Sequence, residues 1–175
     1  MRILVLVCIA SLLYLSTISG VYTKQPTIKV SYDELLPDAR KQVDCLAENI
    51  LFEAGNQPKD GQLAVALVTL NRVNSHNFPT TICSVVRQKV DNRCQFSWWC
   101  EGKLKAKALT KNYSHDEKRR LEKAKQIALN AYVNYDRIHD VTNGATFYHA
   151  DYVKPGWKSV HKTVQIGQHI FYRKS

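Results

Sequence analysis

Several motifs that mark common protein classes are missing from this chain of 175 residues. It has no zinc-finger spacing, no glycine-rich phosphate loop and no nucleic-acid-binding motif, which argues against nucleotide, metal and nucleic-acid partners. It also has no internal repeat, low-complexity linker or second region of distinct composition. We therefore expect one globular domain, a monomer that needs no cofactor.

Acidic residues are scarce: 15 Asp and Glu stand against 25 Lys and Arg, which gives a formal net charge of +10. A surplus of this size favours polyanionic partners. For an exported protein we expect anionic cell-wall polymers or lipid headgroups, because a nucleic-acid partner would require the protein to act inside the cell.

Residues 1–22 have the pattern of a targeting segment. Arg2 is followed by the almost uncharged run ILVLVCIASLLYLSTISGVY, which small residues close. This is typical of a signal peptide, and its length also permits an uncleaved signal-anchor in contact with the membrane. We expect export to the periplasm, cell wall or extracellular space, with residues 23–37 as an N-terminal lead and 38–175 as the single domain.

Cysteines are few, and one of the five, Cys8, lies inside the targeting segment. The remaining four, Cys45, Cys83, Cys94 and Cys100, predict two structural disulfides in an oxidising compartment, with three possible connectivities. The short interval from Cys94 to Cys100 suits a local bridge, which leaves Cys45 to pair with Cys83. A thiol nucleophile with a histidine base is the weaker alternative, because export tends to oxidise a thiol.

One predicted helix ends beside a carboxylate. Apolar residues recur at helical spacing through residues 43–54, and Gly55 follows where a C-terminal glycine cap is expected. Glu53 falls at the edge of the buried stripe, whereas Glu48 projects toward the far side. Only Glu53 should be desolvated, which raises the pKa of its carboxyl group and suits it to donate a proton. The plainer interpretation is a polar residue in a last helical turn.

The rest of the chain predicts an α+β fold, mainly helical, with a small antiparallel β element in the C-terminal third. Residues 62–73 are apolar nearly all round and indicate a buried central helix, and a short helix is expected over 81–88. The segment NRCQFSWWCEGK should be an irregular bridged loop. Ser114 and Glu117 form a capping box that opens a long peripheral helix, and alternating β-branched and aromatic residues around Gly167 predict a hairpin.

Several motifs in order resemble the cell wall hydrolase family typified by the spore cortex-lytic enzymes, which are lysozyme-like glycosidases. They are CLAENILFEA, GQLAVALVTLNRV, FPTTIC, CQFSWWC, GATFYHA, VKPGW and IGQHIFYR. The resemblance implies a lysozyme-like fold and cleavage of peptidoglycan glycan strands, with Glu53 as the catalytic acid. Two features depart from the family: where many members read EARGE this chain has Glu53–Gln57, EAGNQ, and it has no separate peptidoglycan-binding repeat.

We favour a single-acid mechanism, because Glu53 is the one carboxyl group with a strong case and because the family resemblance also implies it. In this scheme Glu53 protonates the bridging oxygen and then removes a proton from the muramic acid 6-hydroxyl, which is lytic transglycosylation. The close alternative is a hydrolytic muramidase with a second carboxylate, for which the candidates are Asp60, Asp91, Glu101 and Asp151.

Substrate contacts are predicted from two segments. We assign Gln95, Phe96 and Ser97 to the cleft, and we place Tyr148 and His149 opposite Glu53. The aromatic residues Trp98, Trp99 and Trp157 either stack on sugars or belong to the core.

Two other classes compete with a glycan-cleaving enzyme. A zinc-dependent wall peptidase would use His149 and Asp151 with His161 or His169, although no HExxH helix accompanies them. A non-catalytic wall-binding module would fit the small size, the disulfides and the positive charge.

Overall fold

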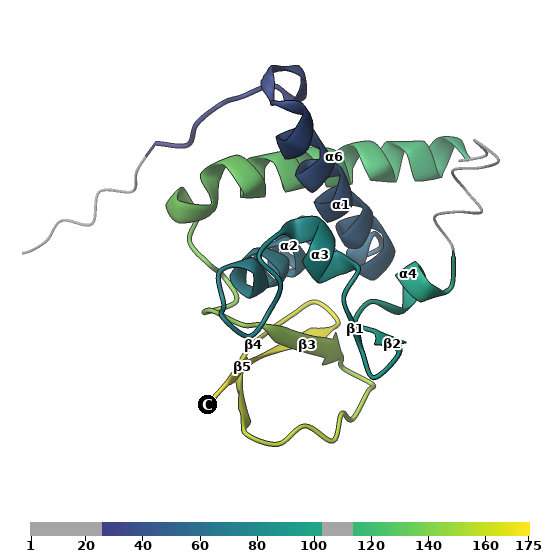
Figure 1. The fold of residues 1–175 in the computed structure, drawn as a ribbon, viewed down its shortest axis with the longest axis vertical. Helices are drawn as coiled ribbons and strands as arrows, with labels where there is room; N and C mark the ends of the chain where they lie inside the picture. Colours follow the sequence, from purple (N-terminus) through teal and green to yellow (C-terminus); the bar gives the residue numbers. More distant parts are fainter. Residues whose placement is uncertain (1–25, 103–113) are drawn as a thin grey trace, which may run out of the picture.

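The structure is a computed structural model that describes residues 26–102 and 114–175. Over these ranges the helices are α1 (Pro37–Ala54), α2 (Lys59–Val73), α3 (Ile82–Val86), α4 (Ser97–Cys100) and α6 (His115–Asn134), with 3-10 turns at Tyr32–Glu34 and Tyr135–Arg137. The strands are β1 (Lys89–Val90), β2 (Arg93–Cys94), β3 (Phe147–Ala150), β4 (Val160–Ile166) and β5 (His169–Lys174). The predicted α+β class, helical first and β in the C-terminal third, is confirmed (Figure 1).

Helix α2 is the centre of the helical part. Every residue from Ala64 to Arg72 is buried, because α1, α3 and α6 contact α2 and the sheet lies along its remaining side (Figure 1). Helix α6 turns a stripe of small residues, Ala124, Ala128 and Ala131, into the core. The expected capping box opens α6, since the Ser114 side chain accepts from the Glu117 N–H and Glu117 Oε2 accepts from the Ser114 N–H.

Both ends of α1 have a steric explanation. Pro37 begins α1, where its fixed φ and missing N–H are tolerated. Helix α1 ends at Ala54 as predicted. Gly55 has an ordinary right-handed φ of −62°, and glycine is needed there because a Cβ would lie 2.3 Å from the carbonyl oxygen of Leu51.

The C-terminal sheet is antiparallel in the order β3-β5-β4. Gly167 makes the β4–β5 turn with a φ of +56°, and a Cβ there would lie 2.5 Å from Gln57 Oε1. The Gln57 amide accepts from the Gln168 N–H at 3.1 Å and donates to Gln168 Oε1 at 2.8 Å. Gln57 therefore joins the sheet to the α1–α2 loop through one donated and one accepted hydrogen bond. A carboxylate at this position, as in EARGE, has no hydrogen to donate.

Both expected disulfides are present: Cys45–Cys83 joins α1 to α3, and Cys94–Cys100 joins β2 to α4. The segment around the second bridge was predicted to be irregular. It instead forms the β1–β2 hairpin and one short helix. Asp91 and Asn92 have φ values of 50° and 60°, which a two-residue hairpin turn requires. Strands of two residues are too short to produce an alternating pattern.

The N-terminal lead is attached to the domain. The Ile28 N–H donates to Asn134 Oδ1 at 2.6 Å, and Asn134 Nδ2 donates to the Ile28 carbonyl at 3.0 Å. The predicted targeting segment over residues 1–22, with Cys8, lies outside the described residues. In the described part of the chain, none of the helices has the length and apolar character needed to cross a bilayer.

Asp140 organises the connection between α6 and the sheet. Its carboxylate accepts from the Thr142 N–H, the Thr142 hydroxyl, the Gly144 N–H and Asn71 Nδ2, at distances of 2.6 to 2.9 Å. Burial alone would raise the pKa of Asp140, but these hydrogen bonds favour the charged form more strongly and lower the pKa below its ordinary value.

Replacing Asp140 by Asn should lower the free energy of unfolding by about 1–3 kcal/mol at pH 7, because a neutral amide cannot accept all of these hydrogen bonds. Since the pKa is lowered in the folded state, the stabilisation is present above the unfolded-state pKa and is lost as pH falls through the folded-state pKa. Urea unfolding at pH 7 and near pH 3 measures both effects. Asp136→Asn, an exposed neighbour, is the matched control, and equal losses in the two variants would contradict the assignment.

The two disulfides should differ in their contribution to stability. Cys45–Cys83 closes a separation of 38 residues and Cys94–Cys100 one of 6. In the chain-entropy model these loops correspond to about 4 and about 2 kcal/mol. Thermal or urea unfolding of the two double Cys→Ala variants compares them, and a larger loss on removing the short bridge would show that local strain or packing dominates.

Candidate active site

Glu53 lies in the last turn of α1, half-buried, where the helix meets the sheet. The Tyr148 hydroxyl donates to Glu53 Oε2 at 3.1 Å. Tyr148 comes from β3 and packs against His169 and Phe171 of β5, with ring centroids 5.2 and 5.7 Å apart. Burial, and next the charge of Glu53, raises the pKa of Tyr148 well above its ordinary value. The phenol is therefore a permanent hydrogen-bond donor to the carboxyl group.

Arg72, in the last turn of α2, brings a buried cation to the same place. Its side chain is 5% exposed, its Nε donates to the Thr146 carbonyl at 2.7 Å, and its guanidinium lies 5.2 and 5.3 Å from the ring centres of Phe78 and Phe96. Burial lowers the pKa of Arg72, while its electrostatic interactions with Tyr148 and Glu53 raise it. Thr146, whose carbonyl accepts from Arg72, lies two residues before Tyr148 on the chain that enters β3. Because Tyr148 in turn donates to Glu53, the three side chains belong to one region, which we call the Glu53 cluster.

Arg72 was not among the residues predicted from the sequence. The available signal was an arginine inside a helix that is otherwise apolar nearly all round, because a charge in a buried helix needs a partner. Its partners come from elements far apart in the sequence, which is why the pattern of α2 alone does not identify them.

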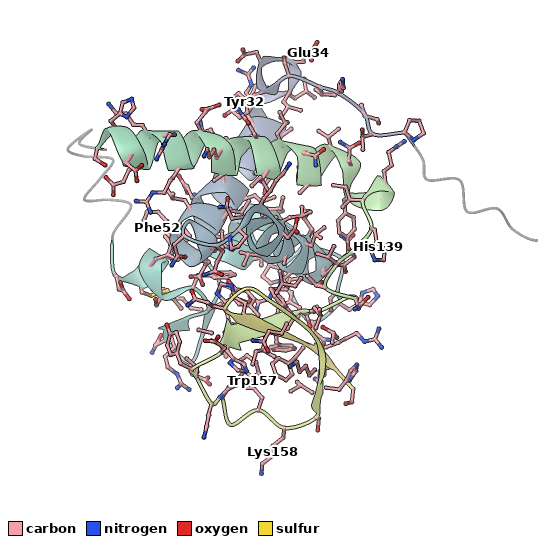
Figure 2. The ribbon with its side chains drawn as sticks, turned by 180° about the vertical axis from the view of Figure 1, so that it is seen from behind. Tyr32, Glu34, Phe52, His139, Trp157 and Lys158 are labelled. Carbon is pink, nitrogen blue, oxygen red and sulfur yellow. A yellow bond between two sulfur atoms is a disulfide. The ribbon has the colours of Figure 1, made fainter. Side chains whose placement is uncertain are left out.

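His149 does not join Tyr148 beside Glu53. Successive strand residues point to opposite faces of a sheet, so Tyr148 faces the helices and His149 faces away from them. His149 stacks on Tyr172 at 5.2 Å, and its Nε2 lies 3.0 Å from the Tyr172 hydroxyl. Trp157 packs against both rings and is 40% exposed. Figure 2 shows Trp157 on the side of the sheet remote from the helices.

The three residues assigned to the cleft lie in different environments. Phe96 is buried beneath Arg72, so its ring serves packing, whereas Gln95 and Ser97 are exposed. Gln95 lines a cavity of about 850 Å³ together with amide side chains and aromatic rings, namely Asn74, Asn77, Gln88, Phe78 and Phe147. Such a lining offers the hydrogen-bonding groups and apolar faces that sugars need.

The neighbouring tryptophans belong mainly to the interior. Trp98 is buried, stacks on Phe52 at 4.7 Å and donates from its indole N–H to Asn49 Oδ1. Trp99 is half-buried and lies under the guanidinium of Arg87. Of the three tryptophans, only Trp157 is exposed.

The expectation that Glu48 is solvated was wrong. Glu48 does point to the far side of α1, but α6 and α3 pack against that side, and burial raises the pKa of Glu48 to about 7. The charges of Arg87 and Lys125 lower it, and that of Asp44 raises it. Helical periodicity separates the two faces of α1 correctly but does not show that both faces are covered.

The residues of the zinc hypothesis are not arranged as ligands. Within residues 26–102 and 114–175, no three His, Cys, Asp or Glu side chains gather as a metal site would require. His149 pairs with Ile170 in the sheet register, so His149 and His169 lie on opposite faces.

Comparison with known proteins gives a consistent family. The model of the family described as Cell Wall Hydrolase matches residues 56–172, beginning three residues after Glu53. The chain is 28% identical over 134 residues to the spore cortex-lytic enzyme of Oceanobacillus iheyensis, covering 76% of this chain and 42% of that protein. It is 31% identical over 131 residues to the spore cortex-lytic enzyme of Halalkalibacterium halodurans, covering 74% and 34%. The chain thus spans less than half of the length of these curated relatives.

Solved structures share the fold. The catalytic domain of the germination-specific lytic transglycosylase SleB from Bacillus anthracis superposes with a TM-score of 0.54 at 24% identity, covering 77% of this chain and 95% of that chain. The catalytic domain of the Bacillus cereus SleB protein gives 0.51 at 24% identity, covering 88% and 99%. These likenesses establish the lysozyme-like architecture expected from the sequence. Because the family model matches more than half of its length, this chain belongs to the Cell Wall Hydrolase family.

Proposed function

We propose that this chain cleaves the glycan strands of peptidoglycan as a lytic transglycosylase, with Glu53 as the acid and then the base. The observation that carries the proposal is the half-buried Glu53 carboxyl group, which accepts a hydrogen bond from the half-buried Tyr148 phenol. Relatives named as cortex-lytic enzymes and as a lytic transglycosylase support the choice of substrate and reaction.

The reaction needs one carboxyl group. Protonated Glu53 gives its proton to the oxygen between N-acetylmuramic acid and N-acetylglucosamine, and the bond from that oxygen to C1 of the muramic acid breaks. The 6-hydroxyl of the same sugar then bonds to C1, and its proton goes to the Glu53 carboxylate. The product is a 1,6-anhydro ring, no water is consumed, and Glu53 is restored to its protonated state.

Tyr148 assists by orienting the carboxyl group. Its hydroxyl holds Glu53 Oε2, which directs the group between the end of α1 and the sheet and stabilises the carboxylate formed after proton donation. Gln95 is the residue that we propose for a sugar contact, through its amide. Trp157 lies on the face of the sheet opposite Glu53, so we assign it no contact beside the reacting bond.

Hydrolysis with a second carboxylate is the other candidate reaction. Asp60, Asp91, Glu101 and Asp151 are all exposed, in turns or at the ends of elements. An exposed carboxylate suits water activation less than a half-buried one, which favours the anhydro product. Export, and the affinity for anionic wall polymers, remain predictions from the sequence.

Replacing Glu53 by Gln should reduce lysis of purified sacculi by about 10²–10⁴-fold, because the amide cannot transfer the proton. Mass spectrometry of wild-type digests should show anhydro-ended fragments, one water lighter than hydrolytic ones. Glu48→Gln, on the same helix and also partly buried, is the matched control and should retain lysis. Undiminished lysis by Glu53→Gln would refute the assignment, and exclusively reducing-end fragments would establish hydrolysis instead. Retained sacculus binding without lysis separates an enzyme from a wall-binding module.

Replacing Tyr148 by Phe should lower kcat by about 10–100-fold, the effect of one hydrogen bond to a charged group. The ring still fills its site, so the thermal midpoint should fall only slightly. Tyr32→Phe is the control, because the Tyr32 hydroxyl likewise donates to a carboxylate, Asp44 Oδ2 at 2.7 Å, at the N-terminal end of α1. If both variants lose activity equally, Tyr148 has no special place in the reaction.

A further inference from the structure

Arg72 is a buried charge that the reaction just described does not use. Its guanidinium lies over the rings of Phe78 and Phe96. Its Nε donates to the backbone carbonyl of Thr146, two residues before Tyr148, whose hydroxyl donates to Glu53. Nη1 is buried and has no hydrogen-bond partner in the described part of the chain. An apolar side chain would fill this space without the cost of burying a cation. The arrangement therefore indicates that the positive charge itself is needed.

We propose that Arg72 is a positioning residue whose buried guanidinium stabilises the ionised form of Glu53, so that one carboxyl group can both give and take a proton. This inference rests on the proposed function, because it assigns Arg72 a role in the chemistry of Glu53. It names a residue that does not touch the substrate.

A carboxyl group that acts as an acid and then as a base must have a proton affinity matched to the working pH. Burial disfavours the carboxylate, and a group that holds its proton too tightly is a weak acid. A fixed cation offsets this effect without competing for the proton, since arginine stays protonated in proteins. The two flanking rings hold the guanidinium in place through cation–π contact and exclude water.

Other titratable groups surround the Glu53 cluster. Tyr148 reaches Glu53 from β3, and His169 of β5 packs on Tyr148. Burial lowers the pKa of His169, the charge of Asp151 raises it, and that of His149 lowers it. A separate set of groups meets at the far face of α1: Asp44 and Glu48 of α1 itself, Arg87 at the end of α3 and Lys125 of α6. That set offers an internal comparison, because Arg87 acts on Glu48 as we propose that Arg72 acts on Glu53.

The test is the titration of individual carboxyl groups by NMR, with ¹³C-labelled glutamate. The Glu53 resonance is assigned by its loss in Glu53→Gln. In Arg72→Met, Glu53 should titrate at higher pH, by about one pH unit or more, because a neighbouring cation no longer favours the carboxylate. In Arg72→Lys the charge is kept and most of the shift should disappear. The alkaline limb of the pH–kcat profile should move in the same direction, with little change in KM.

Arg87→Met is the matched control. It removes another arginine that lies over an aromatic ring, Trp99 at 4.9 Å, and it should shift the titration of Glu48 while leaving that of Glu53 unchanged. If Arg72→Met does not fold, Arg72→Gln, which can still donate to Thr146, takes its place. A folded variant of either kind in which Glu53 titrates as in the wild type would overturn the proposal and reduce Arg72 to a packing residue.

The titration does not depend on catalysis. If Glu53→Gln retained lysis, the proposed function would fail, yet the NMR experiment would still report whether Arg72 governs Glu53. If instead the lysis results held and the Glu53 titration did not move, only the role of Arg72 would be lost.

Discussion

The hydrogen bond between Tyr148 and Glu53 joins the two halves of this molecule. Glu53 lies in the last turn of α1 and Tyr148 lies in β3. The hydrogen bond therefore forms only if the sheet docks correctly on the helices. The other contacts at this junction maintain that docking. Gln57 hydrogen-bonds to the β4–β5 turn, and Asn71 and Asp140 hold the chain that enters β3.

Burial is the common physical constraint on the Glu53 cluster. A phenol, a guanidinium and a carboxyl group lie in a partly or fully buried region, so each alters the ionisation of the others more strongly than it would at a surface. In our proposal Arg72 and Tyr148 favour the ionised carboxyl group, and burial favours the neutral one. The acid–base role that we propose for Glu53 needs these opposing effects in balance.

The departure from the family motif has a structural explanation. The residue four positions after Glu53 is Gln57 rather than a glutamate, and its amide donates to and accepts from Gln168 in the same hairpin turn. This contact requires glycine at position 167, because any Cβ there would collide with the Gln57 side chain. The position therefore serves the docking of the sheet in this chain.

Local patterns in the sequence determined a large part of the structure by themselves. The helical spacing before Glu53, the apolar run of α2, the Ser114 capping box, the hairpin around Gly167 and the parity of the cysteines each depend on neighbours along the chain, and all were predictable. What only the tertiary structure decided was the environment of each polar group. Glu48 is covered by α6 and α3, Arg72 meets rings from two other segments, and strand alternation turns His149 away from Glu53. Burial and charge pairing depend on residues distant in sequence, and periodicity carries no information about which distant element will cover a given face.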